Sequence, residues 1–426
     1  MRSRDICMLI VMVASAFQLS AEPLSISVNA ESAILMNAHT GAILYEKKAR
    51  TPQYPASITK IATGLYLLKK KGHNLGESVV ADQEAIVSTT EEAKRRANFS
   101  LPPYWIERGS THIGIKKGEE LTLEDLLYGM LVASGNDAAN VIAQHVGGTI
   151  PIFMAELNVY LKEIGCQNTT FNNPHGLFHP QHKTTAYDMA VMTREAVKNP
   201  TFCEVVKTVR YTRPKTNKQD STTLVQTNKL LRSGKLHYAP AFGVKTGYTA
   251  LSQNTFVAAA KKDDRVLIAV LLKTKEREDM FRDATRLFEA AFNQPKIERV
   301  LAKSGPQKFS LDLEGAVKPV KTYADSDLTL VYYPAEEPKV KALLAWDSVT
   351  PPIVKGQRVG ALSLQDGQGN ILKTVPLLAQ EDVSSSWLNS LKHLMATLTC
   401  PLAWKVLFLV VVAALIGWFF VRRARG

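Results

Sequence analysis

The chain has 426 residues, of which 46% are hydrophobic and 21% charged, an ordinary composition for a folded protein with room for a main domain, a smaller one and tails. Its formal net charge is +13, but the Lys and Arg residues are spread along the chain and form no basic stripe interleaved with aromatic residues. This distribution argues against nucleic-acid binding and suits contact with an anionic polymer or a membrane headgroup layer.

The four cysteines and nine histidines show no spacing typical of a metal site, so we expect neither a metal nor another cofactor. Cys166 and Cys203 are compatible with one disulfide in an oxidising compartment and equally with two buried thiols. His175 lies in a predicted loop, where a lone histidine is more often structural than catalytic.

The first element in chain order is an apolar run from Ile6 to Phe17, preceded by Arg2 and Arg4 and followed by a small residue, Ala21. This pattern predicts a secretory signal peptide over residues 1–21. An uncleaved anchor is the alternative, but the run is short for a full membrane span.

Two short strands and a helix are predicted next. Apolar runs on either side of the turn-like residues 37–41 predict the strands, between Glu31 and Tyr45. A helix is predicted to start at Pro55, because proline suits a first helical turn, and to end near Gly72.

Ser57 and Lys60 lie three residues apart on this predicted helix and therefore share a face. A serine hydroxyl is a weak nucleophile until a base takes its proton, and a lysine can be that base if burial or a nearby cation lowers its pKa. The free N–H groups at a helix start can also stabilise an oxyanion. Alone, however, Ser-x-x-Lys is more often a solvated helix face.

A polar, charged excursion occupies residues 82–110, with part-helical character predicted between Glu84 and Ala97. Its role cannot be read from the sequence.

A second polar cluster, Ser134-Gly135-Asn136, interrupts two predicted helices. The first helix starts at Thr122 with Asp125 completing a capping box, and Asp137 is predicted to cap the second, residues 138–146. Such a connection can present two polar side chains to a cleft, although taken by itself it is more typical of a simple turn. Further helices are predicted over residues 152–164 and from Thr185, with Asp188 as its capping partner.

Strands are predicted over residues 255–260 and 266–272, preceded by Lys245-Thr246-Gly247. Lys245 offers a fixed cation for a carboxylate, and Gly247 leaves room for a substrate backbone beside the strand edge. The simpler alternative is an ordinary hairpin strand. An amphipathic helix, marked by Phe281, Phe288 and other apolar residues, should pack on this sheet.

The sequence pattern changes after Pro295. Short β-like runs separated by turn clusters predict a small all-β domain over residues 295–383, followed by an amphipathic linker at 384–401. Residues 402–421 are almost wholly apolar and precede a basic tail at 422–426, which predicts a transmembrane anchor with that tail in the cytoplasm.

The three short motifs at Ser57, Ser134 and Lys245 occur in the order and type found in penicillin-interacting serine enzymes. From about Glu31 to Val383 the chain resembles a low-molecular-mass penicillin-binding protein, a serine peptidase of the D-alanyl-D-alanine carboxypeptidase family. The blocks that carry this resemblance are Pro55–Lys60, Ser134–Ala139, Asn173–Leu177, Thr227–Leu230, Val244–Tyr248 and Pro352–Gly360.

The resemblance implies a β-lactamase-like α/β (α+β) catalytic domain over residues 22–294, with an antiparallel sheet flanked by helices. It also implies removal of the terminal D-alanine from peptidoglycan stem peptides ending in D-Ala-D-Ala. Ser57 would attack the carbonyl, Lys60 would accept its proton, and Ser134 would relay a proton toward the departing amine. β-Lactams would acylate Ser57 as substrate mimics.

The resemblance further implies a set of substrate-binding residues. Asn136 would hold the peptide amide, and Lys245 and Thr246, next to Gly247, would bind the terminal carboxylate. The backbone N–H groups of Ser57 and Tyr248 would form the oxyanion hole. The expected location is the inner membrane, with the catalytic domain on the periplasmic side.

The sequence departs from the family pattern in three ways: the long excursion, the lack of the usual glycine between Tyr248 and Asn254, and the C-terminal anchor. The anchor is predicted to cross the membrane, whereas an amphipathic surface helix is common in the family. A β-lactamase is disfavoured because residues 172–179 contain no carboxylate to drive deacylation. A DD-endopeptidase that cuts cross-links, and a non-catalytic penicillin-binding or wall-binding protein, remain as alternatives.

Overall fold

The computed structural model describes residues 10–11, 23–72 and 74–386, which fall into two compact units. Of the described residues, the helix–sheet unit contains 23–72, 74–295 and Pro334–Glu336. The strand unit contains Lys296–Tyr333 and the chain from Glu337 onward, with Ile10 and Val11. Each unit is described by itself.

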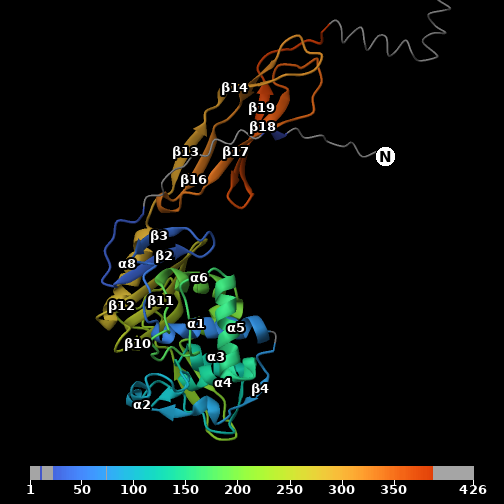
Figure 1. The fold of residues 1–426 in the computed structure, drawn as a ribbon. Helices are drawn as coiled ribbons and strands as arrows, with labels where there is room; N and C mark the ends of the chain where they lie inside the picture. Colours follow the sequence, from blue (N-terminus) through green and yellow to red (C-terminus); the bar gives the residue numbers. More distant parts are fainter. Residues whose placement is uncertain (1–9, 12–22, 73, 387–426) are drawn as a thin grey trace, which may run out of the picture. The chain divides into compact units, whose positions relative to one another are not determined.

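A five-stranded antiparallel sheet forms the centre of the helix–sheet unit, in the order β10-β11-β12-β2-β3 (Figure 1). Its edge strand β10 pairs with β11 so that Lys245 lies opposite Val257 and Gly247 opposite Thr255. The strands are β2 (Ser32–Asn37), β3 (Ile43–Lys47), β10 (Ala241–Thr249), β11 (Gln253–Lys262) and β12 (Arg265–Thr274). The strands predicted between Glu31 and Tyr45 and over 255–272 are therefore confirmed.

Both faces of this sheet are buried, because alternate residues of its strands enter two different apolar clusters. In β2, Ala33 and Leu35 join the cluster under α8 (Arg277–Phe292), whereas Ile34 and Met36 join the cluster formed with the other helices. Figure 1 shows α8 on one side of the sheet and α6 and α1 on the other. The remaining helices of this face are α1 (Lys60–Lys71), α3 (Leu123–Leu131), α4 (Asn136–Gly147), α5 (Ile150–Glu163), α6 (Ala186–Ala196) and α7 (Pro200–Lys207).

Helix starts agree with the sequence predictions at two positions and correct them at two others. The capping box of Thr122 and Asp125 is present, and Thr185 accepts the N–H of Asp188. The segment predicted to be helical from Pro55 begins instead as a 3-10 turn, η1 (Ala56–Thr59). Asp137 was predicted to cap α4, but α4 already includes it, and its carboxylate accepts backbone N–H groups of residues 113–115.

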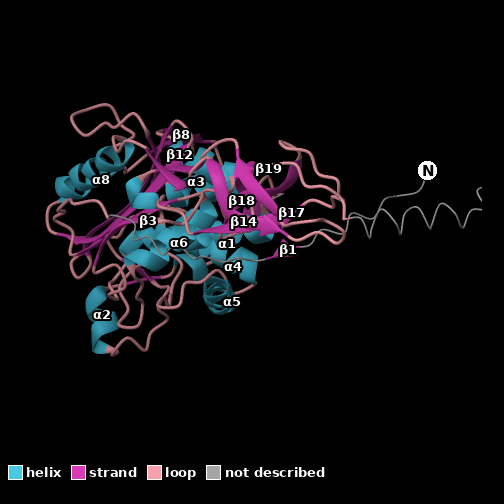
Figure 2. Cartoon of the chain, turned by 90° about the horizontal axis from the view of Figure 1, so that it is seen from above, coloured by secondary structure: helices cyan, strands magenta, loops and turns pink. Residues whose placement is uncertain are grey.

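The excursion folds into short elements, and the part-helical character predicted between Glu84 and Ala97 is confirmed by η2 (Glu84–Ile86) and α2 (Glu91–Arg96). Figure 2 shows α2 at the periphery of the unit, apart from the other helices. The elements of the excursion are η2, β5 (Ser88–Thr89), α2 and β6 (Ile106–Glu107). The strands on either side of it, β4 (Ser78–Val80) and β7 (Glu120–Thr122), pair with each other. A separate hairpin, β8 (Arg210–Arg213) and β9 (Thr222–Val225), follows α7.

The strand unit contains a six-stranded sheet in the order β1-β17-β18-β19-β15-β14 and a two-stranded sheet of β13 and β16, which pack around their own apolar cluster. This agrees with the β-like runs seen in the sequence. Its strands are β1 (Ile10–Val11), β13 (Ile297–Ala302), β14 (Gly305–Leu311), β15 (Val320–Ala324), β16 (Leu328–Tyr332), β17 (Val340–Trp346), β18 (Arg358–Asp366) and β19 (Ile371–Ala379).

Both Cys166 and Cys203 are free thiols, the first buried and the second half-buried. In the part of the chain that the structure describes, no helix is both long and apolar enough to cross a bilayer. The predicted linker and anchor lie outside the described residues beyond position 386, as does most of the predicted signal peptide.

Candidate active site

The turn that carries Ser57 is held by close contacts from distant segments. Ala56 has a φ of +52°, in the left-handed region, and the Oγ1 of Thr255 on β11 donates to the carbonyl oxygen of Pro55 at 2.8 Å. Gly176 packs directly on the turn, because a Cβ added to it would overlap the Ala56 carbonyl oxygen. These contacts keep the Ser57 hydroxyl in place at the start of α1.

The side chain of Lys60 is fully buried beneath this turn. Its Nζ lies 3.0 Å from Ser57 Oγ, 2.6 Å from Asn136 Oδ1 and 2.9 Å from the carbonyl oxygen of His175. Burial lowers the pKa of Lys60 well below its usual value, and the nearby charge of Lys245 lowers it further, against an opposing effect of Asp137. The amine is therefore suited to take a proton from the serine.

Ser134 lies in the connection between α3 and α4, and Asn136 is the first residue of α4. Ser134 has a φ of +67°, and its Oγ accepts a hydrogen bond from Lys245 Nζ at 2.9 Å. Asn136 uses both ends of its amide: Oδ1 accepts from Lys60, and Nδ2 donates to Ser110 Oγ at 3.0 Å. These two residues therefore contact both lysines of the site.

The edge strand β10 supplies the third group of side chains. Lys245 is fully buried, and burial lowers its pKa to about 7. The Oγ1 of its neighbour Thr246 lies 2.8 Å from Thr227 Oγ1. A Cβ added to Gly247 would come within 2.7 Å of the Ser57 backbone nitrogen, so only glycine allows the strand to approach the nucleophile so closely.

A cleft of about 500 Å³ opens at these groups. Tyr248 is 68% exposed and lies among the residues that line the cleft. The cleft is lined by Ser57, Thr111, Ser134, Thr227, Thr246, Gly247, Tyr248, Asn254, Lys275, Glu276, Arg277 and Met280. The structure thus brings together all the predicted site residues, with Lys60, Asn136 and Lys245 buried behind the cleft wall.

Several residues at or around this cleft were not predicted as site residues, and three of them contact the predicted ones. Ser110 lies at the end of the excursion and touches Asn136, Thr227 lines the cleft beside Thr246, and Gly176 packs under Ser57. Only Thr227 and Gly176 carried a signal, because each falls within a sequence block that resembles the family.

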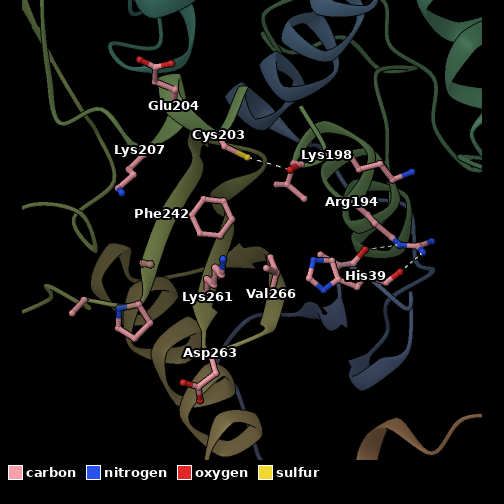
Figure 3. Close-up of a pocket in the computed structure, with 15 residues that line it drawn as sticks. His39, Arg194, Lys198, Cys203, Glu204, Lys207, Phe242, Lys261, Asp263 and Val266 are labelled. Carbon is pink, nitrogen blue, oxygen red and sulfur yellow. Dashed lines mark hydrogen bonds between the residues drawn. The ribbon is translucent and has the colours of Figure 1, made fainter. Parts of the chain in front are cut away.

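A larger cavity of about 950 Å³ lies elsewhere, at the start of β10, and none of the three motifs contributes to its lining (Figure 3). There the Arg194 guanidinium donates to the carbonyl oxygens of Ala38 and His39, and the Cys203 thiol to that of Val197. Across the described ranges, no three His, Cys, Asp or Glu side chains are grouped as a metal ion would require.

A serine hydroxyl lies beside a buried lysine at a cleft shared with a second serine and a second lysine, an arrangement that suits a serine hydrolase. The sequence matches the family described as D-alanyl-D-alanine carboxypeptidase over residues 17–276, and that described as the C-terminal domain of penicillin-binding protein 5 over residues 311–385. The chain therefore belongs to the D-alanyl-D-alanine carboxypeptidase family.

Individual relatives agree with this assignment. The D-alanyl-D-alanine carboxypeptidase DacF of Bacillus subtilis is 32% identical over 368 residues, which cover 84% of this chain and 86% of DacF. The crystal structure of DacD from Francisella tularensis shows the same fold, with a TM-score of 0.58 at 23% identity over 87% of this chain and 97% of that one. The DD-transpeptidase of Streptomyces K15 superposes with a TM-score of 0.54 at 28% identity, over 63% of this chain and 98% of that one.

Proposed function

We propose that this protein is a serine-type D-Ala-D-Ala carboxypeptidase that removes the terminal D-alanine from peptidoglycan stem pentapeptides through an acyl-enzyme on Ser57. The observation that carries the proposal is the 3.0 Å separation between Ser57 Oγ and the Nζ of Lys60, an amine whose pKa is held well below its usual value by burial.

Acylation would begin when the neutral Lys60 amine takes the proton of Ser57 Oγ as the oxygen attacks the carbonyl carbon of the D-Ala-D-Ala bond. The backbone N–H groups of Ser57 and Tyr248 would stabilise the oxyanion. Collapse of the tetrahedral intermediate breaks the C–N bond, and Ser134 would pass a proton to the departing D-alanine amine. Water would then hydrolyse the Ser57 ester and release the shortened peptide.

Recognition of the chain end would come from the buried cation behind the cleft. Lys245 contacts Ser134 and lies next to Thr246, whose hydroxyl pairs with that of Thr227 at the cleft surface. These groups suit a carboxylate, which a terminal D-alanine carries and an internal peptide bond lacks. This preference favours carboxypeptidase action over cleavage of cross-links, and Asn136 would hold the amide of the stem peptide.

β-Lactams combine an amide-like carbonyl with a nearby carboxylate, so the same groups would direct them to acylate Ser57. We also infer that the enzyme works outside the cytoplasm, because the sequence carries a signal-peptide pattern over residues 1–21 and an apolar run over residues 402–421 followed by basic residues. That run would anchor the protein in the inner membrane.

The activity is tested by incubating the protein with a pentapeptide ending in D-Ala-D-Ala and measuring free D-alanine. The parent should release D-alanine and Ser57→Ala should release none above background. Absence of release by the parent, or equal release by both proteins, would refute the proposal. A peptide with a C-terminal amide should be a poor substrate, because it lacks the carboxylate that Lys245 would bind.

A further inference from the structure

Ser110, the last residue of the excursion, is connected to the amine of Lys60 through a single side chain. Its Oγ accepts a hydrogen bond from Asn136 Nδ2 at 3.0 Å. The Oδ1 of the same amide accepts from Lys60 Nζ at 2.6 Å. The Asn136 amide therefore has one end on the excursion and the other on the amine.

The segment around Ser110 is firmly attached to the start of α4. The backbone N–H of Asn136 donates to the carbonyl oxygen of Thr111 at 2.9 Å. The carboxylate of Asp137 accepts the N–H groups of Ile113, Gly114 and Ile115 at 2.9 to 3.0 Å. These bonds fix the chain just after Ser110, and the N–H of Ser110 itself donates to the carbonyl oxygen of Glu107 at 3.0 Å, so its hydroxyl is presented to the amide from a fixed position.

The orientation of the amide decides what the amine can do. A neutral amine has two N–H groups and one lone pair, and the Asn136 Oδ1 and the His175 carbonyl oxygen accept protons only. When both N–H groups donate to these oxygens, the lone pair is left for Ser57 Oγ at 3.0 Å. If the amide turned around, its NH₂ group would donate to the amine and occupy that lone pair.

We propose that Ser110 is a positioning residue that holds the Asn136 amide with its oxygen toward Lys60 and so keeps the lone pair of the amine directed at Ser57. The inference rests on the roles proposed above for Ser57 and Lys60. Ser110 acts only through Asn136, and the excursion, which has no role readable from sequence, acquires one as a support of the base.

The test measures the rate constant with which a labelled penicillin acylates the full chain. Ser110→Ala should lower it about tenfold, equivalent to ~1.4 kcal/mol of activation free energy. Ser110→Thr keeps the hydroxyl and should retain most of the rate. The matched control is Ser100→Ala, which removes another hydroxyl of the excursion, bonded to the carbonyl oxygen of Ala97, and should leave the rate unchanged.

A double-variant cycle shows whether the effect passes through Asn136. If it does, Ser110→Ala combined with Asn136→Ala should acylate no more slowly than Asn136→Ala alone. Losses that multiply in the double variant would overturn the proposal, as would a Ser110→Ala rate within twofold of the parent. If Ser110→Ala fails to fold, Ser110→Cys replaces it, since a thiol is a poor acceptor of similar size.

The pH profile separates positioning from general loosening of the loop. If Ser110→Ala weakens the hydrogen bond from the ammonium form of Lys60 to Asn136, the pKa of Lys60 falls. The acidic limb of the pH profile of the acylation rate constant should then move to lower pH. A loop that merely detached would admit water and move the limb to higher pH, which contradicts the proposal. The other groups facing Lys60 are Lys245, Asp137 and the His175 ring, and none of the three is substituted in these variants.

Acylation of Ser57→Ala distinguishes this inference from the proposed function. If Ser57→Ala is still acylated, the assignment of the nucleophile fails. If Ser57→Ala is inert but Ser110→Ala behaves as the parent, only the positioning role fails.

Discussion

Two groups of buried cations in the helix–sheet unit differ in what surrounds them. Away from the cleft, Lys94 pairs with Glu107 at 3.1 Å and Arg213 with Glu119 at 3.5 Å, as is usual for charges removed from water. At the cleft, no carboxylate within the described residues forms an ion pair with Lys60 or Lys245. Their neighbours are instead hydroxyl, amide and carbonyl oxygens.

This difference explains the chemistry of the cleft. A carboxylate beside Lys60 would stabilise its ammonium form and remove the base, whereas uncharged acceptors orient the amine and leave its pKa low. On the proposed mechanism, Lys60 would take a proton and Lys245 would bind the carboxylate of a substrate, whereas the ion-paired Lys94 and Arg213 would stabilise the fold. The following variants test this division.

The largest expected effect is that of Lys60→Met. Removing the base should slow acylation by a labelled penicillin about 10³-fold, the scale of general-base catalysis. The unfolding midpoint should stay close to that of the parent, because no buried carboxylate loses its partner. An acylation rate within tenfold of the parent, in a folded variant, would show that Lys60 is not the base.

Glu119→Gln should show the opposite pattern. Glu119 is fully buried and pairs with Arg213, which would be left as an uncompensated charge. The free energy of unfolding should fall by about 3 kcal/mol, measured by chemical denaturation, while kcat at low temperature stays near the parent value. A large loss of kcat with unchanged stability would remove the distinction between the two groups of cations.

Lys245→Gln should have a smaller effect with a characteristic pH signature. The value of kcat/KM for the pentapeptide should fall about thirtyfold through loss of a charged contact to the carboxylate. Because the charge of Lys245 lowers the pKa of Lys60, removing it raises that pKa, and the acidic limb of acylation should move to higher pH. Lys261→Gln, which changes an exposed lysine of β11, is the control. A shift of this acidic limb to lower pH would contradict the proposed effect of the Lys245 charge on the pKa of Lys60.

The sequence was sufficient to predict the family and the residues that meet at the cleft, because Ser57, Ser134 and Lys245 each lie in a short motif and occur in a diagnostic order. It was insufficient where a role depends on contacts between distant segments. Ser110 lies in a polar stretch without pattern and gains its meaning only from the amide of Asn136. Gly176 was part of a recognisable block, but its close approach to Ala56 is a property of the folded chain.

Local rules also failed where tertiary contacts compete with them. Aspartate is a common helix-capping residue, but the carboxylate of Asp137 accepts hydrogen bonds from the backbone N–H groups of residues 113–115 instead. The helix predicted from Pro55 begins as a 3-10 turn, with Ala56 in the left-handed region. Both exceptions lie at the site, where packing against neighbouring segments overrides local preference.

The central claim is that the hydroxyl of Ser57 is the group that becomes acylated. Its most direct test is to treat the protein with a penicillin, digest it and locate the adduct by mass spectrometry. The account predicts one penicilloyl group, on the peptide that contains Ser57. An adduct on a peptide containing Ser134 or Ser110 instead, or no adduct on folded protein, would contradict it.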